Sequence, residues 1–163
     1  MADVRWLDDD EQKAWRAFIT ATVLITRALD KEMRDEHGLS LDDYAILALT
    51  SEAPGQRLRF GELAQALRAP KAHVTYRSQR LRELGLVERI DCPEDGRGAY
   101  CELTPKGRRA IEDAAPTHVA GVRTHLLDHL SANQRDALGQ ACDAVLDGHA
   151  ATCPETPPLP ART

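Results

Sequence analysis

The chain has 163 residues and a mass of 18.0 kDa, enough for one domain with a buried core or for a small domain with helical extensions. Hydrophobic residues make up 42% of the chain but aromatic residues only 4%, so the core has to be built mainly from Leu, Val, Ile and Ala. The sequence contains no long apolar run and no apolar signal segment behind a charged start, so we expect a cytoplasmic protein without a membrane partner.

The formal net charge of -5 is unevenly distributed. Between Arg57 and Arg109 there are twelve Lys and Arg against seven Asp and Glu, a net charge of +5, whereas the rest of the chain has nine basic and nineteen acidic residues. An acidic chain with a basic middle third is suited to contact phosphates on one face. The alternative is an ordinary fluctuation of charge on solvated faces.

The first part of the chain is predicted to form two helices. Asp8 or Asp9 caps a helix of about 25 residues or more, whose apolar residues recur at helical spacing until His37 and Gly38 end it. This apolar stripe is long for a small domain, so we expect it to lie between subunits. Ser40, with an acid three residues later, opens a second helix that ends near Ser51.

The middle of the chain is predicted to form a helix-turn-helix. Residues 56–60 are a short extended piece, residues 61–67 a short third helix, and residues 71–84 a basic fourth helix. Pro70 suits the first turn of the fourth helix, because its missing N–H has no partner at that position.

A hairpin follows directly. Residues 86–91 and 99–103 alternate like paired strands, and the residues between them are rich in turn formers. A basic helix that runs into a glycine-tipped hairpin has the layout of a winged helix. We interpret the helix as the element that enters a DNA major groove, and the hairpin as reaching the neighbouring groove.

The last part of the chain is predicted to form two more helices. Thr104 and Pro105 open a long one with an apolar stripe and a kink at Pro116, and Ser131 opens a closing helix whose last apolar face comes before Gly148. The predicted fold class is therefore mainly α with a small β-hairpin wing. Its parts are a flexible N-terminus (1–7), a dimerisation helix and linking helix (8–54), a winged helix-turn-helix DNA-binding lobe (55–103), C-terminal dimerisation helices (104–150) and a disordered Pro-rich tail (151–163).

This order of elements resembles the MarR family of regulators across about residues 6–148. The motifs that carry the resemblance are Leu-Ser at 39–40, Arg-Phe-Gly-Glu-Leu-Ala-Gln-Ala-Leu at 59–67, Val-Thr at 74–75, Arg-Leu at 80–81, Leu-Gly-Leu-Val at 84–87, Asp-x-Arg at 95–97 and Leu-Thr-Pro-x-Gly at 103–107. The resemblance implies a two-fold dimer held by the first and last helices. It also implies a pseudo-palindromic DNA site read in successive major grooves about 34 Å apart.

The fourth helix is predicted to pack Val74, Leu81 and Leu84 into the core and to present donors to DNA from its other face. The predicted DNA-binding residues of this helix are Lys71, His73, Thr75, Tyr76, Arg77, Gln79 and Arg80. Arg77 and Ser78 depart from the family, which tends to have aliphatic residues there, and Arg77 is either a DNA contact or part of an intramolecular pair. In the wing, Arg97 is expected to enter the minor groove with Asp95 orienting it.

Sensing residues are less clearly marked in the sequence. Trp15, Phe18 and Tyr44 are predicted to line an aromatic effector pocket, with plain core packing as the alternative. The pair His125 and His129 has metal-compatible spacing but no further ligand nearby, so no metal site is predicted. The four cysteines are read as reduced, with ordinary packing favoured over a redox role for Cys92 and Cys101.

The predicted function follows from these elements. No nucleophile, base and orienting group come together in any motif, so neither an enzyme nor a cofactor is expected. We predict a homodimeric, sequence-specific regulator that binds double-stranded DNA and represses transcription until a small-molecule effector, in the simplest case aromatic, releases it. The alternatives are a winged-helix module that binds proteins without DNA, or a redox- or zinc-responsive regulator of the same fold.

Overall fold

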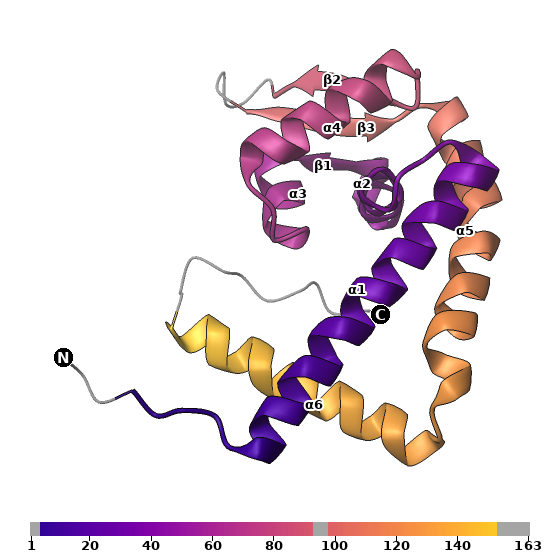
Figure 1. Ribbon diagram of the computed structural model, residues 1–163. Helices are drawn as coiled ribbons and strands as arrows, with labels where there is room; N and C mark the ends of the chain where they lie inside the picture. Colours follow the sequence, from indigo (N-terminus) through magenta and orange to yellow (C-terminus); the bar gives the residue numbers. More distant parts are fainter. Residues whose placement is uncertain (1–3, 93–97, 153–163) are drawn as a thin grey trace.

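The computed structural model describes residues 4–92 and 98–152. Figure 1 shows a lobe of short helices and strands joined by two long helices to a base. The elements, in chain order, are α1 (Asp9–His37), α2 (Leu41–Glu52), a 3-10 turn (Pro54–Gln56), β1 (Arg57–Arg59), α3 (Phe60–Ala66), α4 (Lys71–Glu83), β2 (Val87–Asp91), β3 (Ala99–Leu103), α5 (Pro105–His125), a second 3-10 turn (Leu127–His129) and α6 (Ala132–Thr152). The described part is therefore mostly helical with one small sheet, and the predicted fold class is confirmed.

Local sequence signals fix the ends of the long helices. Asp8 forms a capping box with Glu11 at the start of α1, and Gly38 ends that helix in the left-handed conformation with φ 66°. Ser40 and Asp43 form the box that opens α2, and the Thr104 hydroxyl accepts a hydrogen bond from the Gly107 amide at the start of α5. The closing helix, α6, continues past Gly148 to Thr152, two residues beyond the predicted end of the C-terminal helices at residue 150.

The sheet of the described residues has the order β1-β3-β2, with both pairings antiparallel. The extended piece predicted near residue 57 thus becomes a strand that pairs with the returning strand of the hairpin. On β3, Ala99, Cys101 and Leu103 are buried, while Tyr100 and Glu102 lie on the opposite face. The buried face covers the apolar side of the lobe and so forms the floor beneath α4.

A single core fills the lobe and extends to the ends of the two long helices. Its buried residues are Met33, Leu39, Ile46, Leu47, Leu63, Ala64, Val74, Leu81, Leu86, Val87, Cys101, Leu103, Ile111 and Ala114. Below it α1 and α5 run side by side, with Gly121 of α5 against Leu29 and Glu32 of α1. Pro116 lies inside α5, which continues through it to His125. No described helix is long and apolar enough to cross a membrane.

The start of α5 is joined tightly to the turn between α4 and β2. The Thr104 hydroxyl donates to the Gly85 carbonyl at 2.8 Å, and Lys106 Nζ donates to the Leu84 carbonyl at 2.7 Å. A Cβ placed on Gly107 would lie 1.9 Å from the Leu86 carbonyl oxygen. Only glycine therefore lets α5 approach the backbone of Leu86, just before β2, so closely.

We predict that Gly107→Ala lowers the free energy of unfolding by about 3 kcal/mol or more, because a methyl group there collides with backbone rather than with a movable side chain. Gly139→Ala is the matched control. Nothing lies within 4 Å of a Cβ at this glycine inside α6, so the change stabilises the helix by about 0.5–1 kcal/mol. Urea unfolding measures both, and a Gly107→Ala protein as stable as wild type would contradict this packing.

A second prediction concerns pH. His118 of α5 lies against Tyr44 of α2, with ring centroids 4.4 Å apart, and burial lowers the pKa of His118. The unfolded chain binds a proton at His118 more readily than the folded chain does. Above pH 6.5 the residue is neutral in both states, and as the pH falls below 6.5 protonation of the unfolded chain lowers the free energy of unfolding. We predict that His118→Phe, which keeps an aromatic ring, makes the loss of stability between pH 7 and 5 shallower than in wild type. An unchanged slope in thermal unfolding would contradict this assignment.

Candidate nucleic-acid interface

The helix-turn-helix consists of α3, a four-residue turn and α4. Its turn requires an unusual backbone, because Arg68 has φ 50° and its amide bonds the Gln65 carbonyl at 3.1 Å. Pro70 precedes α4 as its N-cap, and its carbonyl accepts hydrogen bonds from the His73 and Val74 amides. The sequence predicted this proline in the first turn, which is one residue away from its observed place.

The inner face of α4 is narrow. Val74, Ser78 and Leu81 are buried, which confirms the predicted core role of Val74 and Leu81. The prediction for Leu84 is wrong, because this residue is the C-cap and is 39% exposed. Ser78 lies against Cys101 of β3, where burial raises the pKa of the Cys101 thiol to about 11. Burying Ser78 therefore allows α4 to lie directly over the sheet.

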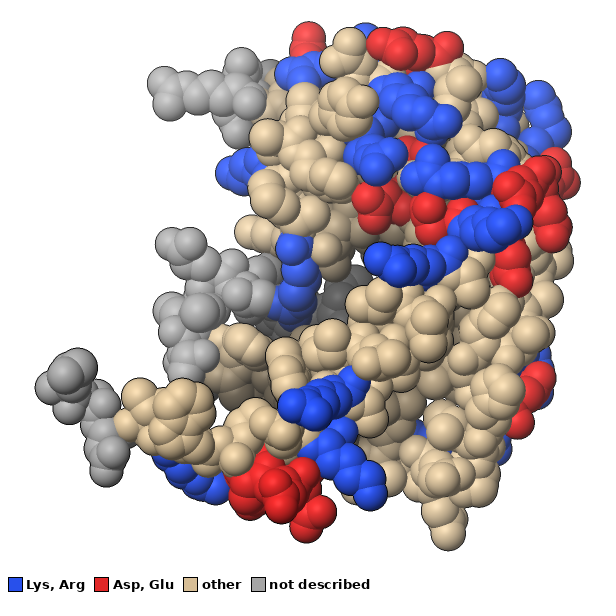
Figure 2. Space-filling view, viewed as in Figure 1, with Lys and Arg blue, Asp and Glu red and all other residues tan. Residues whose placement is uncertain are grey.

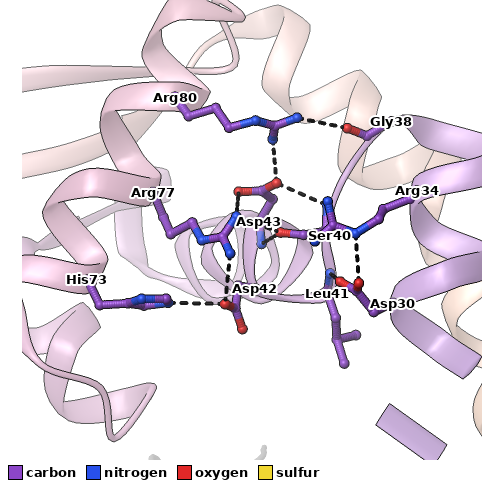
Figure 3. Close-up of polar contacts among 10 residues, drawn as sticks. All are labelled: Asp30, Arg34, Gly38, Ser40, Leu41, Asp42, Asp43, His73, Arg77 and Arg80. Atoms are coloured by element: carbon purple, nitrogen blue, oxygen red, sulfur yellow. Dashed lines mark hydrogen bonds and ion pairs between the residues drawn. The ribbon is translucent and has the colours of Figure 1, made fainter. Parts of the chain in front are cut away.

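Beside this apolar stripe runs a polar one formed by His73, Arg77 and Arg80. All three side chains point towards the first turn of α2 (Figure 3). His73 Nε2 lies 3.1 Å from Asp42 Oδ2. Arg77 lies 3.5 Å from Asp42 Oδ2, 3.9 Å from Asp43 Oδ1 and 3.4 Å from Ser40 Oγ. Positions 73, 77 and 80 are four and three residues apart, so they share one side of the helix.

Arg80 has the strongest of these contacts. One guanidinium nitrogen pairs with Asp43 Oδ2, and another donates to the Gly38 carbonyl at 3.2 Å. Asp43 is 0% exposed, and Oδ2 also accepts from the Ser40 amide at 3.0 Å. The Arg80 side chain is 37% exposed, so the pair is buried only on the side of Asp43, and without Arg80 this carboxylate would keep the Ser40 amide and the more distant Arg77 as partners. Arg80 thus has an internal contact, and its predicted role in DNA binding stays a prediction.

The outward face of α4 carries the remaining predicted contacts. Lys71, Thr75, Tyr76 and Gln79 are all exposed, and the Tyr76 ring is 68% exposed in spite of its size. The Thr75 hydroxyl donates to the Lys71 carbonyl at 2.9 Å, and the Gln79 amide donates to Glu83 at 3.3 Å. These bonds lie within one helix at its surface. The side chains are available to another molecule at little cost.

Basic side chains crowd the face of the lobe that contains α4, with acidic ones between them (Figure 2). Near the wing, Arg57 and Arg59 both lie over the Tyr100 ring, at 5.1 and 5.4 Å from its centroid. Arg59 also donates to Cys92 Sγ at 3.4 Å. The predicted wing contacts Asp95 and Arg97 lie outside the described residues, so their role stays a prediction.

The proposed effector residues fall into two places. Trp15 and Phe18 lie together on α1 with ring centroids 6.5 Å apart, each more than half exposed. Tyr44 packs instead against His118 of α5. A pocket beside Trp15 is lined by Arg5, Trp6, Leu7, Gln12 and Arg16, and contains neither Phe18 nor Tyr44. A single chain does not join the three aromatic residues into one cavity.

The residues considered for sensing have structural partners. Cys92 shares its face of the sheet with Tyr100, whereas Cys101 points to the opposite face, and both are free thiols. His125 Nε2 lies 2.6 Å from Glu32 Oε1 of α1 and so joins the two long helices. Within residues 4–92 and 98–152, His, Cys, Asp and Glu do not gather into any group of three or more suited to a metal ion.

Sequence reasoning missed the part that Asp42 and Asp43 play beside α4. Asp43 was recognised only as the capping acid of α2, which its contact with the Ser40 amide confirms. Two signals were present in the sequence. An arginine at position 77, one turn before the buried Leu81, needs an anionic partner, and a capping acid provides one once α4 crosses the start of α2.

Comparison with known proteins agrees with this architecture. A family model described as the MarR family matches residues 37–98. Sco3205, a MarR family transcriptional regulator from Streptomyces coelicolor solved in complex with DNA, is 34% identical with a TM-score of 0.87, covering 91% of this chain and 92% of Sco3205. AbsC, a MarR family regulator from the same organism, is also 34% identical with a TM-score of 0.86, covering 91% of this chain and 99% of AbsC.

A curated relative, the HTH-type transcriptional repressor YetL of Bacillus subtilis (strain 168), is 31% identical over 99 residues, which are 61% of this chain and 59% of YetL. The chain spans less than two thirds of the length of both curated relatives that it matches. The match to Sco3205 and AbsC, in contrast, extends over more than nine tenths of each solved chain. By sequence and by fold, this chain belongs to the MarR family.

Proposed function

We propose that the protein is a transcriptional regulator that binds a specific double-stranded DNA sequence by placing α4 in a major groove. The observation that carries this proposal is the outward face of α4, where Lys71, Thr75, Tyr76 and Gln79 stand exposed on the basic third of the chain. Hydrogen-bond donors and an apolar ring on one face of a protruding helix suit the edges of bases. The relative Sco3205, solved with DNA, supports the same use of this fold.

The exposed residues divide by chemistry. The Lys71 ammonium at the start of α4 suits a phosphate or a guanine edge, and Thr75 and Gln79 suit base edges. The Tyr76 ring offers apolar contact to a thymine methyl and a hydroxyl for hydrogen bonding. We assign His73, Arg77 and Arg80 a smaller share of the DNA contacts, because their contacts with α2 compete with binding to DNA. Arg97, oriented by Asp95, is proposed to enter the minor groove next to the helix.

We propose that the functional unit is a homodimer. The N-terminal half of α1 exposes Trp15, Phe18, Ile19, Val23 and Leu24. In α6, Leu138 and Val145 are exposed as well, and the described side chains of this helix are almost all in contact with solvent. Apolar surface on two helices at the base of the molecule suits a second copy of the chain. Two lobes at a fixed distance would then meet two halves of a pseudo-palindromic site.

The regulatory output that we propose is repression relieved by a small molecule. YetL is named a repressor, which supports this direction for a relative of the same family. A ligand bound between base and lobe would act by favouring a spacing of the two lobes that no longer matches DNA. Trp15, Phe18 and Tyr44 stay the proposed contacts of an aromatic effector, and the separation of Tyr44 from the other two requires residues of the second subunit in such a site.

A salt titration tests DNA binding against the alternative, a winged-helix module that binds only proteins. For binding to the DNA upstream of the protein's own gene, we expect the logarithm of the affinity to fall linearly with the logarithm of the salt concentration. Fluorescence anisotropy measures it. Undetectable binding at low salt, or an affinity that does not depend on salt, would rule out the proposed function.

Substitutions in α4 and in the wing should have different effects. Tyr76→Ala should cost about 1–3 kcal/mol on the preferred sequence and relax discrimination at one or two base pairs. Tyr76→Phe, which keeps the ring, separates the hydroxyl from the apolar contact. Arg97→Ala should weaken binding to all sequences by a similar factor. Equal losses on every sequence from all of these variants would remove the assignment of base reading to α4.

The dimer has its own test. Phe18→Asp places a charge in the exposed apolar part of α1, so we expect sedimentation to show mainly single chains at micromolar concentration, where wild type sediments as a dimer. Arg27→Asp is the matched control, since it places the same charge at an exposed polar position of α1. A Phe18→Asp protein that remains dimeric would place the interface elsewhere.

A further inference from the structure

We infer that Asp43 is a positioning residue for DNA recognition: its buried carboxylate, through Arg80 and Arg77, fixes the orientation of α4 and thereby selects which side chains face the bases. This inference rests on the proposed DNA-binding function and deepens it. It assigns sequence discrimination in part to a residue that lies on α2, is fully buried and touches no DNA.

The contact with Asp43 constrains α4 at more than one point. Oδ2 is hydrogen-bonded to Arg80, while Oδ1 has no hydrogen-bond partner among the described residues and is ion-paired with Arg77 Nη1 at 3.9 Å, so a single carboxylate meets two residues almost one helical turn apart. Arg80 also donates to the Gly38 carbonyl at 3.2 Å. A helix held at two positions along one side can neither rotate about its axis nor slide along it without breaking a contact.

Apolar packing alone would hold α4 loosely. Over its thirteen residues, the buried side chains are those of Val74, Ser78 and Leu81. Two apolar side chains and one hydroxyl provide attraction to the core, but such packing is non-directional and tolerates a change of angle. Directional contacts to charged groups have the geometry that packing lacks. The ionic stripe therefore determines the angle of α4 to a greater extent than the apolar stripe does.

Asp43 itself cannot adapt to a shifted helix. Its carboxylate is tied to its own helix end by the Ser40 amide at 3.0 Å, and the Ser40 hydroxyl accepts from the Asp43 amide at 3.1 Å. The start of α2 is in turn joined to α1, because the Leu41 amide donates to Asp30 at 2.8 Å. The pairs of the neighbouring Asp42 are different, since this side chain is 55% exposed, and its partners His73 and Arg77 are 42% and 22% exposed.

The sign of the effect separates positioning from plain electrostatics. Removing an acidic charge from a lobe that faces phosphates should strengthen DNA binding in general. If Asp43 positions α4, its removal should instead weaken binding to the preferred sequence. The test compares Asp43→Asn with Asp42→Asn, which makes the same change of charge one residue away at the surface. Each variant is titrated with the duplex that wild type enriches from a randomised library and with a scrambled duplex of equal length, at one salt concentration.

For Asp43→Asn we expect the affinity for the enriched duplex to fall about tenfold or more, comparable to the loss of one base contact. The affinity for the scrambled duplex should stay within about twofold of wild type. For Asp42→Asn we expect equal or slightly tighter binding to both duplexes. A folded Asp43→Asn protein whose ratio of the two affinities equals that of wild type would overturn the inference, whatever its melting temperature.

Arg80→Lys decides the question if Asp43→Asn does not fold. It keeps the positive charge but loses the guanidinium that reaches both Asp43 and the Gly38 carbonyl. We expect the ratio of affinities to fall while the salt dependence stays unchanged. Arg80→Gln distinguishes a phosphate contact, since equal losses on both duplexes and a salt slope smaller by about one would show that Arg80 binds DNA and would overturn the inference.

A measurement without DNA keeps this inference separate from the proposed function. In Asp43→Asn or Arg80→Lys, hydrogen exchange should become faster at the amides of α4 and stay unchanged at those of α5. Unchanged exchange in α4 would overturn the positioning role. If wild type enriches no sequence from the library, the proposed function fails, and exchange then reports only on the contact between α2 and α4.

Discussion

A carboxylate without access to water, that of Asp43, lies where three helices meet. It needs compensating charge and hydrogen bonds, which come from Arg80 of α4 and the backbone at Ser40, while Asp30 of α1 accepts from the adjacent Leu41 amide. The same pairing ties up cations on one side of α4 and leaves exposed the other side, which we propose to contact DNA. The division of the recognition helix into an inner and an outer face therefore follows from one buried charge as well as from the apolar core.

The two ends of the molecule satisfy different requirements. In the lobe, the sheet and the short helices enclose a core in which Leu47, Leu63, Val74 and Leu81 have 0% exposure. At the base, large apolar side chains such as Trp15 and Leu24 remain in contact with water. The lobe thus buries its apolar side chains within one chain, whereas the base leaves large apolar side chains exposed. This difference is expected of the proposed homodimer, in which each copy supplies one DNA-binding lobe.

Most of the fold could be predicted from local patterns, because capping boxes, a left-handed glycine and alternating strands are determined by neighbouring residues. Asp8, Ser40 and Thr104 each cap the helix that the sequence assigned to them. The exposure of Leu84 could not be read in this way, since it depends on where α4 ends. The pairing of Arg80 with Asp43 was hidden for another reason. It joins residues 37 positions apart, and only the crossing of α2 and α4 brings them together.

The close approach at Gly107 also determines where the molecule can bend. Lys106 and Thr104 hold the carbonyls of Leu84 and Gly85, and the missing Cβ of Gly107 lets α5 touch the backbone of Leu86. The connection between the lobe and α5 is therefore stiff, and a rotation of the lobe must move the first turns of α5 with it. Further along, Pro116 has no N–H to donate to the preceding helical turn. This helix therefore lacks one backbone hydrogen bond near its middle, so in the proposed dimer a change in the spacing of the two lobes would bend α5 most readily at that point.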